Sequence, residues 1–493
     1  MIEPLTHNQF STVKKTILIS IVWLVSTAIP GYAQSIDELT AEKAAQNWAS
    51  QHHGFSIFQS QVLKDKNGAI LGYQYDLSPS GYLVMSTEEG LPPVMAYSLS
   101  SQFSTGKGEY NPLYEMLVLD MAGRLEYLDL TTKETRDKNR SLWVSLLEQG
   151  PRTRVFEQWP PAGTTSTGGW LETNWKQSHP YNKFCPMDNV NNARSVAGCP
   201  AVALSMIINY QGNLNGTQFN DDDDYYHSYA GRQYWIDGDA HGWDFPDFPS
   251  LNEYFDSIET KFPEGTPLNE DEIAALVFGC GVAARQVYTS QVSGTFGVDQ
   301  AYDAYLRFGY QDAILIYDSD TTFYTQMRDN IIEAMSVHLA VLSNTGQGGH
   351  NVVADGYNTD DYYHLNFGWG GSYNGWYLLP DEIPYNLTII GGAVVDIGAS
   401  HVGINAPNND HASLKTSIYP NPVQGIMYIT IPGVNIDNAL IEILSLDGRT
   451  ISRKRCHEGT DNTEVDVSSL LPGMYLCKIT LDNTSSVKKF FKD

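Results

Sequence analysis

An apolar segment that opens with Gly198-Cys199-Pro200 and continues to Ile208 is the feature that most restricts the fold of this chain. Pro200 suits the first turn of a helix, where an amide hydrogen is not needed, and Gly198 lets the backbone turn sharply into that helix. A thiol at a helix N-terminus lies at the positive end of the helix dipole, which stabilises the thiolate. A buried structural cysteine is the commonest alternative, and the local sequence supports both interpretations equally.

Composition limits the class of protein. The 493 residues are 42% hydrophobic and 18% charged, which favours packed cores over disorder. Thirty Lys and Arg against 57 Asp and Glu give a net charge of −27, which argues against nucleic acid as a partner. Five cysteines are too few for a disulfide scaffold. The chain has no His-Glu-x-x-His and no Cys-x-x-Cys motif, so we expect no metal site and no cofactor.

The N-terminus has the features of a secretory signal peptide over residues 1–33. Lys14 and Lys15 precede a short apolar run, and a small residue, Ala33, follows at the exit. The apolar run is shorter than the roughly 20 residues that cross a bilayer. We therefore expect an exported protein whose mature form has no membrane span.

Three folded blocks are expected after the signal peptide, separated by polar stretches rich in Pro and Gly. Their bounds are residues 34–160, 165–400 and 412–493, with a linker of low structure over 156–168. The first block is predicted to be α+β, with helices over 38–49 and 113–130 and strands over 69–77, 81–86 and 94–97. The last block has short β-rich runs between turns and is predicted to be all-β.

A cysteine nucleophile needs a base, and both His338 and His350 lie at a suitable distance after Cys199 in the sequence. His338 is in an apolar run, where a hydrogen-bonded core histidine is favoured. His350 follows Gly349 and opens a strand predicted over 351–357, where flanking glycines allow a substrate to approach the backbone. His364, in the middle of the returning strand, is a weaker alternative because its neighbours are large.

Two further side chains are expected near His350. Antiparallel counting about the turn Asn358-Thr359-Asp360 places Trp369 opposite His350, within two residues, and Asn366 a few positions further in. A hydrogen bond from Asn366 would fix the imidazole tautomer, and Trp369 would shield the pair from water. The sequence does not decide which of the two orients the ring.

These motifs together resemble the streptopain family of secreted bacterial cysteine peptidases. The matching segments, in chain order, are Asn174-Trp175-Lys176-Gln177, Gly198-Cys199, Gly279-Cys280-Gly281, Gly349-His350 and the run from His364 to Gly371. The resemblance implies a papain-like, α+β peptidase domain and no cofactor. It also implies the site residues, which are a catalytic set of Cys199, His350, Gln177 (oxyanion hole) and Asn366, and a substrate-binding set of Gly349, Phe367 and Trp369. Pro200 and Phe367 depart from the family pattern, which more often has an apolar non-proline residue and Trp there.

The flanking blocks resemble parts of the same kind of precursor. Residues 34–160, with Gly81–Ser86 and Leu91–Ser98, are similar to the family's inhibitory pro-domain. Residues 412–493, with Tyr419-Pro420-Asn421-Pro422, are similar to the β-sandwich sorting domain of bacterial type IX secretion. The resemblance implies a secreted or cell-surface protein whose partners are protein or peptide substrates, its own pro-domain and the type IX machinery. Whether Cys456 and Cys477 of the last block form a disulfide stays open.

Two other functions compete with a secreted cysteine endopeptidase made as a zymogen. A catalytically inactive papain-like adhesin or inhibitor would keep the aromatic platform and lose the thiolate–imidazole pair. A glycan-binding or glycan-cleaving protein would use the abundant acidic and aromatic residues. The joint presence of Gln177, Cys199 and His350 favours the peptidase.

Overall fold

The structure is a computed structural model, and it describes residues 35–52, 54–103, 111–148, 156–342, 349–380, 389–398, 417–420, 423–430, 439–445, 450–456, 462–481 and 484–492. The helices are α1 Glu38–Gln51, α2 Pro112–Glu126, α3 Lys133–Leu147, α4 Cys199–Gln211, α5 Ala240–Trp243, α6 Phe248–Glu264, α7 Glu270–Ala283, α8 Asp299–Arg307 and α9 Phe323–Ile332, with 3₁₀ turns η1 Leu128–Leu130 and η2 Asp221–Asp223. The strands of the first two blocks are β1 Ser56–Lys64, β2 Ile70–Ser78, β3 Tyr82–Ser86, β4 Val94–Ser98, β5 Gln158–Trp159, β6 Met187–Asp188, β7 Ala193–Arg194, β8 Tyr225–Tyr229, β9 Arg232–Ile236, β10 Ile314–Ile316, β11 Val337–Leu342, β12 Gly349–Asn358, β13 Tyr363–Asn366, β14 Gly375–Tyr377 and β15 Ile390–Val395. Those of the last block are β16 Ser417–Tyr419, β17 Ile426–Thr430, β18 Leu440–Leu444, β19 Thr450–Arg455, β20 Asn462–Asp466, β21 Gly473–Leu481 and β22 Thr484–Lys492.

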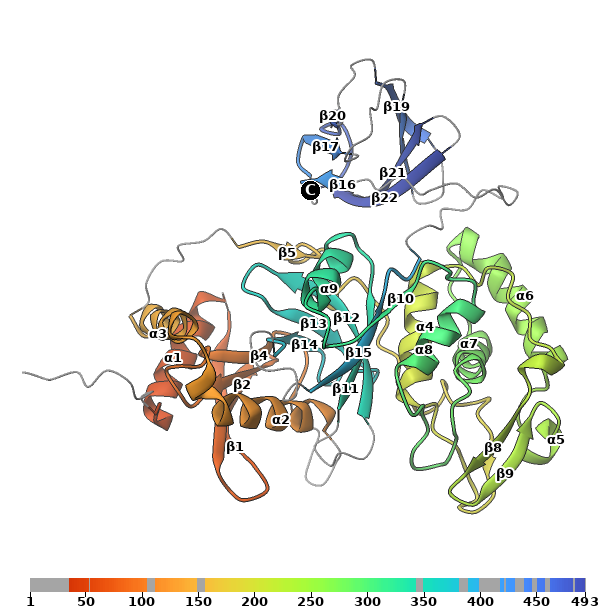
Figure 1. Ribbon diagram of the computed structural model, residues 1–493, viewed down its shortest axis with the longest axis horizontal. Helices are drawn as coiled ribbons and strands as arrows, with labels where there is room; N and C mark the ends of the chain where they lie inside the picture. The colour runs from red at the N-terminus through yellow and green to blue at the C-terminus, as the bar shows by residue number, and fades with distance from the viewer. Residues whose placement is uncertain are drawn as a thin grey trace, which may run out of the picture.

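One antiparallel sheet runs through the first two blocks (Figure 1). Its strand order is β1-β2-β3-β4-β14-β13-β12-β11-β15-β10, and β5 pairs with β12. The pairing of β4 with β14, which sets Tyr97 opposite Trp376, joins the block at 34–160 to the block at 165–400. The two blocks therefore share backbone hydrogen bonds across a single sheet.

Strands β3 and β4 of the first block are buried on both faces. Leu83 and Met85 of β3 belong to a core formed with α1 and α3, whereas Tyr82 and Val84 belong to the core that contains α2 and the second block. Successive side chains of a strand point to opposite faces of the sheet, so neighbouring residues of β3 belong to different cores. The first block thus has one core of its own and a second that it shares with the peptidase half.

Several predicted elements of the first block form, with shifted ends. The helix predicted over 38–49 is α1, and the three predicted strands are β2, β3 and β4. The helix predicted over 113–130 ends at Glu126 and is followed by η1. The linker expected to have low structure is wrong at Gln158 and Trp159, which form β5 because Trp159 is buried and stacks on Tyr357 at 6.2 Å.

The second block consists of a helical half and a sheet half (Figure 1). Helix α4 contacts α7 on one side and β12 on the other, and its residues from Pro200 to Ile208 are all buried. This burial on all sides explains why the segment is continuously apolar rather than amphipathic. The arrangement brings the first turn of α4 close to the beginning of β12.

The described part of the last block forms two sheets, with orders β16-β17-β20 and β19-β18-β21-β22, around a separate core. Cys456 and Cys477 are both free and buried. The backbone N–H of Cys456 donates to the Ala439 carbonyl oxygen, whereas Cys477 is paired with Ile443 in the sheet. The two thiols are therefore at different positions along the sheet.

No helix in the described ranges is both long and apolar enough to cross a bilayer.

Candidate active site

Cys199 is the first residue of α4, and the backbone before it requires glycine. Gly198 has φ +85°, and a Cβ there would lie 2.8 Å from Gln286 Oε1 and 3.0 Å from the Ser293 carbonyl oxygen. Any side chain at this position would therefore push the Cys199 backbone out of place. Cys199 is partly exposed, whereas the other four cysteines are buried.

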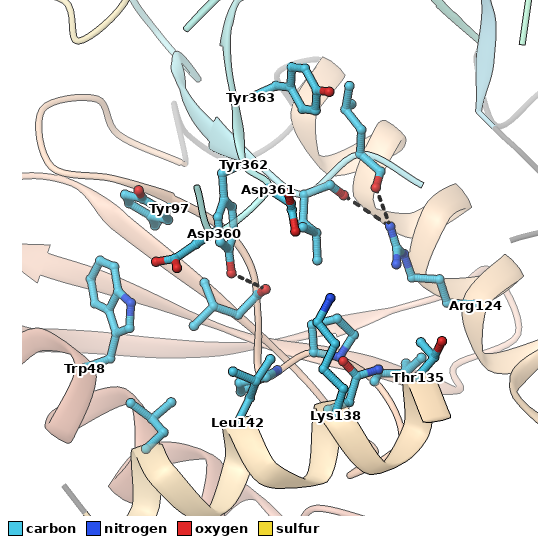
Figure 2. Close-up of a pocket in the computed structure, with 18 of the residues that line it drawn as sticks. Trp48, Tyr97, Arg124, Thr135, Lys138, Leu142, Asp360, Asp361, Tyr362 and Tyr363 are labelled. Atoms are coloured by element: carbon cyan, nitrogen blue, oxygen red, sulfur yellow. Dashed lines mark hydrogen bonds between the residues drawn. The ribbon is translucent and has the colours of Figure 1, made fainter. Parts of the chain in front are cut away.

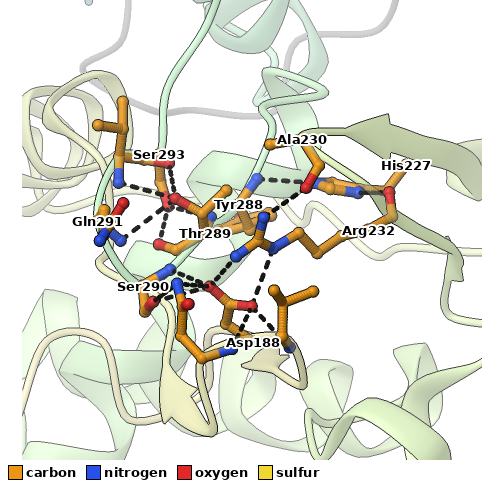
Figure 3. Close-up of polar contacts among 12 residues, drawn as sticks. Asp188, His227, Ala230, Arg232, Tyr288, Thr289, Ser290, Gln291 and Ser293 are labelled. Carbon is orange, nitrogen blue, oxygen red and sulfur yellow. Dashed lines mark hydrogen bonds and ion pairs between the residues drawn. The ribbon is translucent and has the colours of Figure 1, made fainter.

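A buried charge network supports the loop beside Cys199 (Figure 3). Asp188 accepts hydrogen bonds from the Arg232 guanidinium at 2.9 and 2.7 Å and from the backbone and hydroxyl of Ser290 at 2.9 and 2.7 Å. The Thr289 carbonyl then accepts the amide of Val196 at 3.0 Å. The network fixes the loop against the segment that leads into Cys199, which preorganises the thiol. No sequence pattern marks this network, because its members come from distant segments.

His350 is the second residue of β12 and its ring is held by the chain that returns through β13. Its Nε2 donates to the Phe367 carbonyl oxygen at 2.9 Å, which leaves Nδ1 available for a second partner. The Phe367 ring stacks on the imidazole at 6.0 Å, and the Trp369 ring lies 6.3 Å from it. The β12–β13 register pairs Val353 with Asn366, and its continuation sets His350 opposite Trp369, as the sequence count predicted.

The pKa values of Cys199 and His350 are shifted in opposite directions. Burial raises the pKa of the Cys199 thiol, but the His350 charge and hydrogen bonds from His350 and Asn351 outweigh it, so the net pKa is lowered. Burial lowers the pKa of His350, but the Cys199 thiolate, the Phe367 carbonyl and Glu115 outweigh it, so the net pKa is raised. Both directions favour a thiolate–imidazolium pair.

Asn366 has a different set of contacts from the one expected. Its Nδ2 donates to the Thr173 carbonyl at 2.9 Å and its Oδ1 accepts the Gly368 amide at 3.1 Å. The Gly368 amide belongs to the same peptide unit as the Phe367 carbonyl, which accepts from His350. Asn366 therefore orients the imidazole acceptor by fixing that peptide plane, and the side-chain contact predicted between Asn366 and His350 is replaced by the Phe367 carbonyl.

Gln177 and Gly349 are each held by the backbone close to one member of the Cys199–His350 pair. The Gln177 carbonyl accepts the amide of Ala197 at 2.9 Å, so this residue is bonded to the chain two positions before Cys199. The preceding Lys176 forms a bridge with Trp369. A Cβ on Gly349 would lie 2.4 Å from the Val341 carbonyl oxygen, so the residue before His350 has no room for a side chain.

Asn351 is a contact of the thiol that sequence analysis missed. Its backbone N–H lies 3.4 Å and its Nδ2 3.9 Å from Cys199 Sγ. No local pattern marks this residue, because the contact arises only when α4 packs against β12.

The other two candidate histidines are occupied elsewhere. His338 is fully buried between Tyr305 and Asn351, with ring nitrogens 3.1 and 2.8 Å from them, which agrees with the predicted core histidine. His364 Nδ1 lies 2.7 Å from Asp355 Oδ1 in a buried pair. Asp355 Oδ2 also accepts the Leu171 amide at 3.0 Å, so this pair anchors the start of the second block.

Replacing His364 with alanine is expected to lower the free energy of unfolding by about 2–4 kcal/mol, because it leaves a buried Asp355 oxygen without its partner. Chemical denaturation measures this loss. The exposed His241→Ala is the control and should stay within about 0.5 kcal/mol of the parent. If folded His364→Ala is as stable as the parent and has no reactive Cys199 thiol, His364 belongs to the catalytic machinery instead.

Cys199 and His350 both lie within a segment that a protein-family model matches. A model described as the Peptidase C10 family matches residues 175–377, and one described as a secretion system C-terminal sorting domain matches residues 417–493. The chain carries a peptidase C10 (streptopain-family) domain and a type IX sorting domain. C10 enzymes are cysteine peptidases, and the sorting domain assigns the protein to the cell surface or the medium of a bacterium.

Individual relatives are distant. Streptopain of Streptococcus pyogenes serotype M28 is 21% identical over 346 residues, which are 65% of this chain and 77% of the relative. The thiol protease/hemagglutinin PrtT of Porphyromonas gingivalis is 22% identical over 313 residues, which are 61% of this chain and 32% of the relative. A prointerpain A fragment of Prevotella intermedia aligns with a TM-score of 0.46 at 19% identity, covering 69% of this chain and 98% of the fragment.

Proposed function

We propose that this chain is the zymogen of a secreted cysteine endopeptidase in which Cys199 is the nucleophile and His350 the general acid and base. The observation that carries the proposal is the electrostatic coupling of Cys199 with His350, which lowers the thiol pKa and raises the imidazole pKa. Such a pair supplies a nucleophile and a proton donor at neutral pH. Protein or peptide substrates are proposed from the family membership.

The proposed reaction follows from the protonation states of the two residues, a Cys199 thiolate and a His350 imidazolium. The Cys199 thiolate attacks the substrate carbonyl carbon, and the oxyanion lies between the Cys199 amide at the start of α4 and the Gln177 side chain. The His350 imidazolium gives its proton to the leaving amine, which leaves a thioester on Cys199. Neutral His350 then takes a proton from water, the hydroxide releases the acid product, and the thiolate–imidazolium pair is restored.

The proposed substrate cleft lies between α4 and the β12–β13 hairpin. The Phe367 and Trp369 rings form its wall beside His350, and Gly349 allows an extended peptide to approach the backbone before His350. Asn366 acts as a positioning residue through the Phe367 carbonyl.

Labelling of Cys199 tests the proposal. An epoxide that alkylates activated thiols should modify Cys199 in a stoichiometric reaction, located by mass spectrometry, and should stop peptide hydrolysis. Gln177→Ala is the matched control, since losing one oxyanion donor should lower turnover on the order of 10²–10³-fold while Cys199 is still labelled. A chain that hydrolyses peptides at full rate after Cys199 is blocked would exclude this mechanism.

The first block, residues 34–160, is proposed to be the inhibitory pro-domain. Its helix α2 brings Glu115 close enough to His350 for the two charges to interact, and the Tyr82 hydroxyl donates to the Tyr373 carbonyl at 3.0 Å. The Tyr373 ring lies 6.2 Å from the Trp369 ring, so the block contacts a residue that packs beside the proposed cleft wall. Because the coupling between Cys199 and His350 persists in its presence, we propose that it obstructs the cleft rather than separating the pair.

A pocket of about 620 Å³ that is partly open to solvent lies at the junction of pro-domain and peptidase. It lies between Trp48, Lys138 and Leu142 on one side and residues 360–363 on the other (Figure 2). Across this pocket the two blocks are not in direct contact, which reduces the apolar area that they bury against each other. This suits a block that must separate during activation.

A further inference from the structure

A side chain other than that of His350 also contacts the Cys199 sulfur. The register of β11 and β12 pairs His338 with Val353, so His338 and Asn351 lie on one face of these strands, two residues apart. That face packs against α4. Asn351 Nδ2 points to Cys199 Sγ at 3.9 Å and its Oδ1 to His338 Nε2 at 2.8 Å.

The orientation of the Asn351 amide is decisive, because its two ends have opposite effects on a thiolate. The NH₂ end donates to sulfur and stabilises the negative charge, whereas the oxygen end would repel it. His338 selects the first orientation if its Nε2 carries the hydrogen, since Asn351 Oδ1 then becomes the acceptor.

Tyr305 of α8 determines which nitrogen of His338 carries that hydrogen. The buried Tyr305 hydroxyl lies 3.1 Å from Nδ1 and is fully enclosed. Burial raises the pKa of Tyr305 well above its usual value, so the hydroxyl stays protonated. His338 Nδ1 is the acceptor within its reach, so the hydroxyl donates a hydrogen bond to Nδ1. Burial lowers the pKa of His338 to about 4, so the ring is neutral and its single hydrogen is on Nε2.

We propose that Asn351 is a catalytic residue that stabilises the Cys199 thiolate, and that His338 and Tyr305 are positioning residues that hold its amide with the NH₂ end toward sulfur. The proposal rests on Cys199 being the nucleophile. Asn351 adds an uncharged hydrogen-bond donor to the surroundings of the thiolate. The charged group that faces the thiolate is the His350 imidazolium of β12, which interacts in turn with the Glu115 carboxylate of α2. A neutral donor lowers the pKa of the Cys199 thiol whether or not His350 is charged, and so extends thiolate formation toward lower pH.

The rate of Cys199 alkylation against pH tests this on the full chain, with iodoacetamide as the reagent and mass spectrometry to locate the adduct. Asn351→Ala should shift the thiol profile upward, lowering the rate about 3–10-fold on its acidic side, with an unchanged limit at high pH. Asn351→Asp keeps the size and the acceptor for His338 but places a carboxylate oxygen at the sulfur. It should lower the acidic-side rate by about tenfold or more.

A pair of His338 variants separates positioning from packing. His338→Gln retains an N–H donor for Asn351 and should keep a profile close to that of the parent, whereas His338→Leu frees the amide and should shift the profile as Asn351→Ala does. The pH profiles are measured on variants whose near-ultraviolet circular dichroism matches that of the parent. If Asn351→Ala does not fold, the profile of Asn351→Asp tests the role of Asn351.

Two results are distinguishable. If Cys199 reacts no faster than the four buried thiols even in a chain that begins at Phe156, and so lacks the pro-domain that would shield it, the proposed nucleophile is wrong. If Cys199 reacts rapidly in the parent and the folded Asn351 variants titrate as it does, the nucleophile stands and the role of Asn351 is overturned.

Discussion

Replacing Cys199 with serine is expected to lower peptide hydrolysis on the order of 10⁴-fold or more while the fold is kept. The thiol has its pKa lowered by His350 and Asn351, and a serine hydroxyl is far too weak an acid for the same imidazole to ionise it. The side chains are close in size, and Cys199 is partly exposed, so the free energy of unfolding should change little. Turnover of a fluorogenic peptide and thermal unfolding measure the two effects.

Cys185→Ala is the matched control for this prediction. That thiol is fully buried, and burial raises its pKa to about 12, so it is not ionised near neutral pH. The control should cost stability but leave turnover per folded molecule unchanged. Equal activity of parent and Cys199→Ser would remove Cys199 from the mechanism, and activity lost only in Cys185→Ala would move the nucleophile there.

The sequence predicts the parts of the site that depend on short segments. The start of α4 at Cys199 follows from Gly198 and Pro200, whose backbone preferences are local. That His350 lies opposite Trp369 follows from counting residues along one hairpin, because the antiparallel register is fixed once the turn is known. The observed β12–β13 register agrees with this count.

Other parts of the site depend on contacts between distant segments and could not be predicted. The acceptor of His350 is a backbone carbonyl, which every residue has, so no residue type at 367 marks it. The contact of Asn351 with Cys199 requires β12 to pack on α4, and its orientation requires Tyr305 from a third element. The pairing of β4 with β14 likewise uses backbone groups and has no side-chain pattern.

Arg124 is expected to control how firmly the pro-domain holds the peptidase. From α2 it donates to the carbonyl oxygens of Leu378 and Leu379 at 3.2 and 2.9 Å, both in the peptidase half (Figure 2). Its Nε also lies 3.0 Å from both oxygens of Asp120, which accepts from the Tyr377 hydroxyl at 2.8 Å. Arg124 and Asp120 are buried in the joined chain.

The expected loss of inhibition follows from the charges that are buried when the pro-domain and the peptidase associate. In a separated pro-domain Asp120 can be solvated, but docking of an Arg124→Ala variant would bury that carboxylate without its cation. Removing one partner of a buried ion pair costs about 3–5 kcal/mol, and each 1.4 kcal/mol is tenfold in affinity. Inhibition by the variant pro-domain should therefore weaken on the order of 10²–10³-fold.

The experiment uses a peptidase chain that begins at Phe156, because a later start would remove β5 and expose the edge of β12 that it covers. This chain should hydrolyse a small fluorogenic peptide that the uncut precursor does not, and residues 35–148 added in trans should inhibit it. Arg140→Ala is the control, since Arg140 on α3 pairs with Asp137 inside the pro-domain and should not alter inhibition. Tethering raises the local concentration of the pro-domain to about millimolar, so Arg124→Ala in the uncut precursor should restore only part of the activity. Equal turnover of the uncut precursor and the chain from Phe156 would show that residues 34–160 do not inhibit the enzyme.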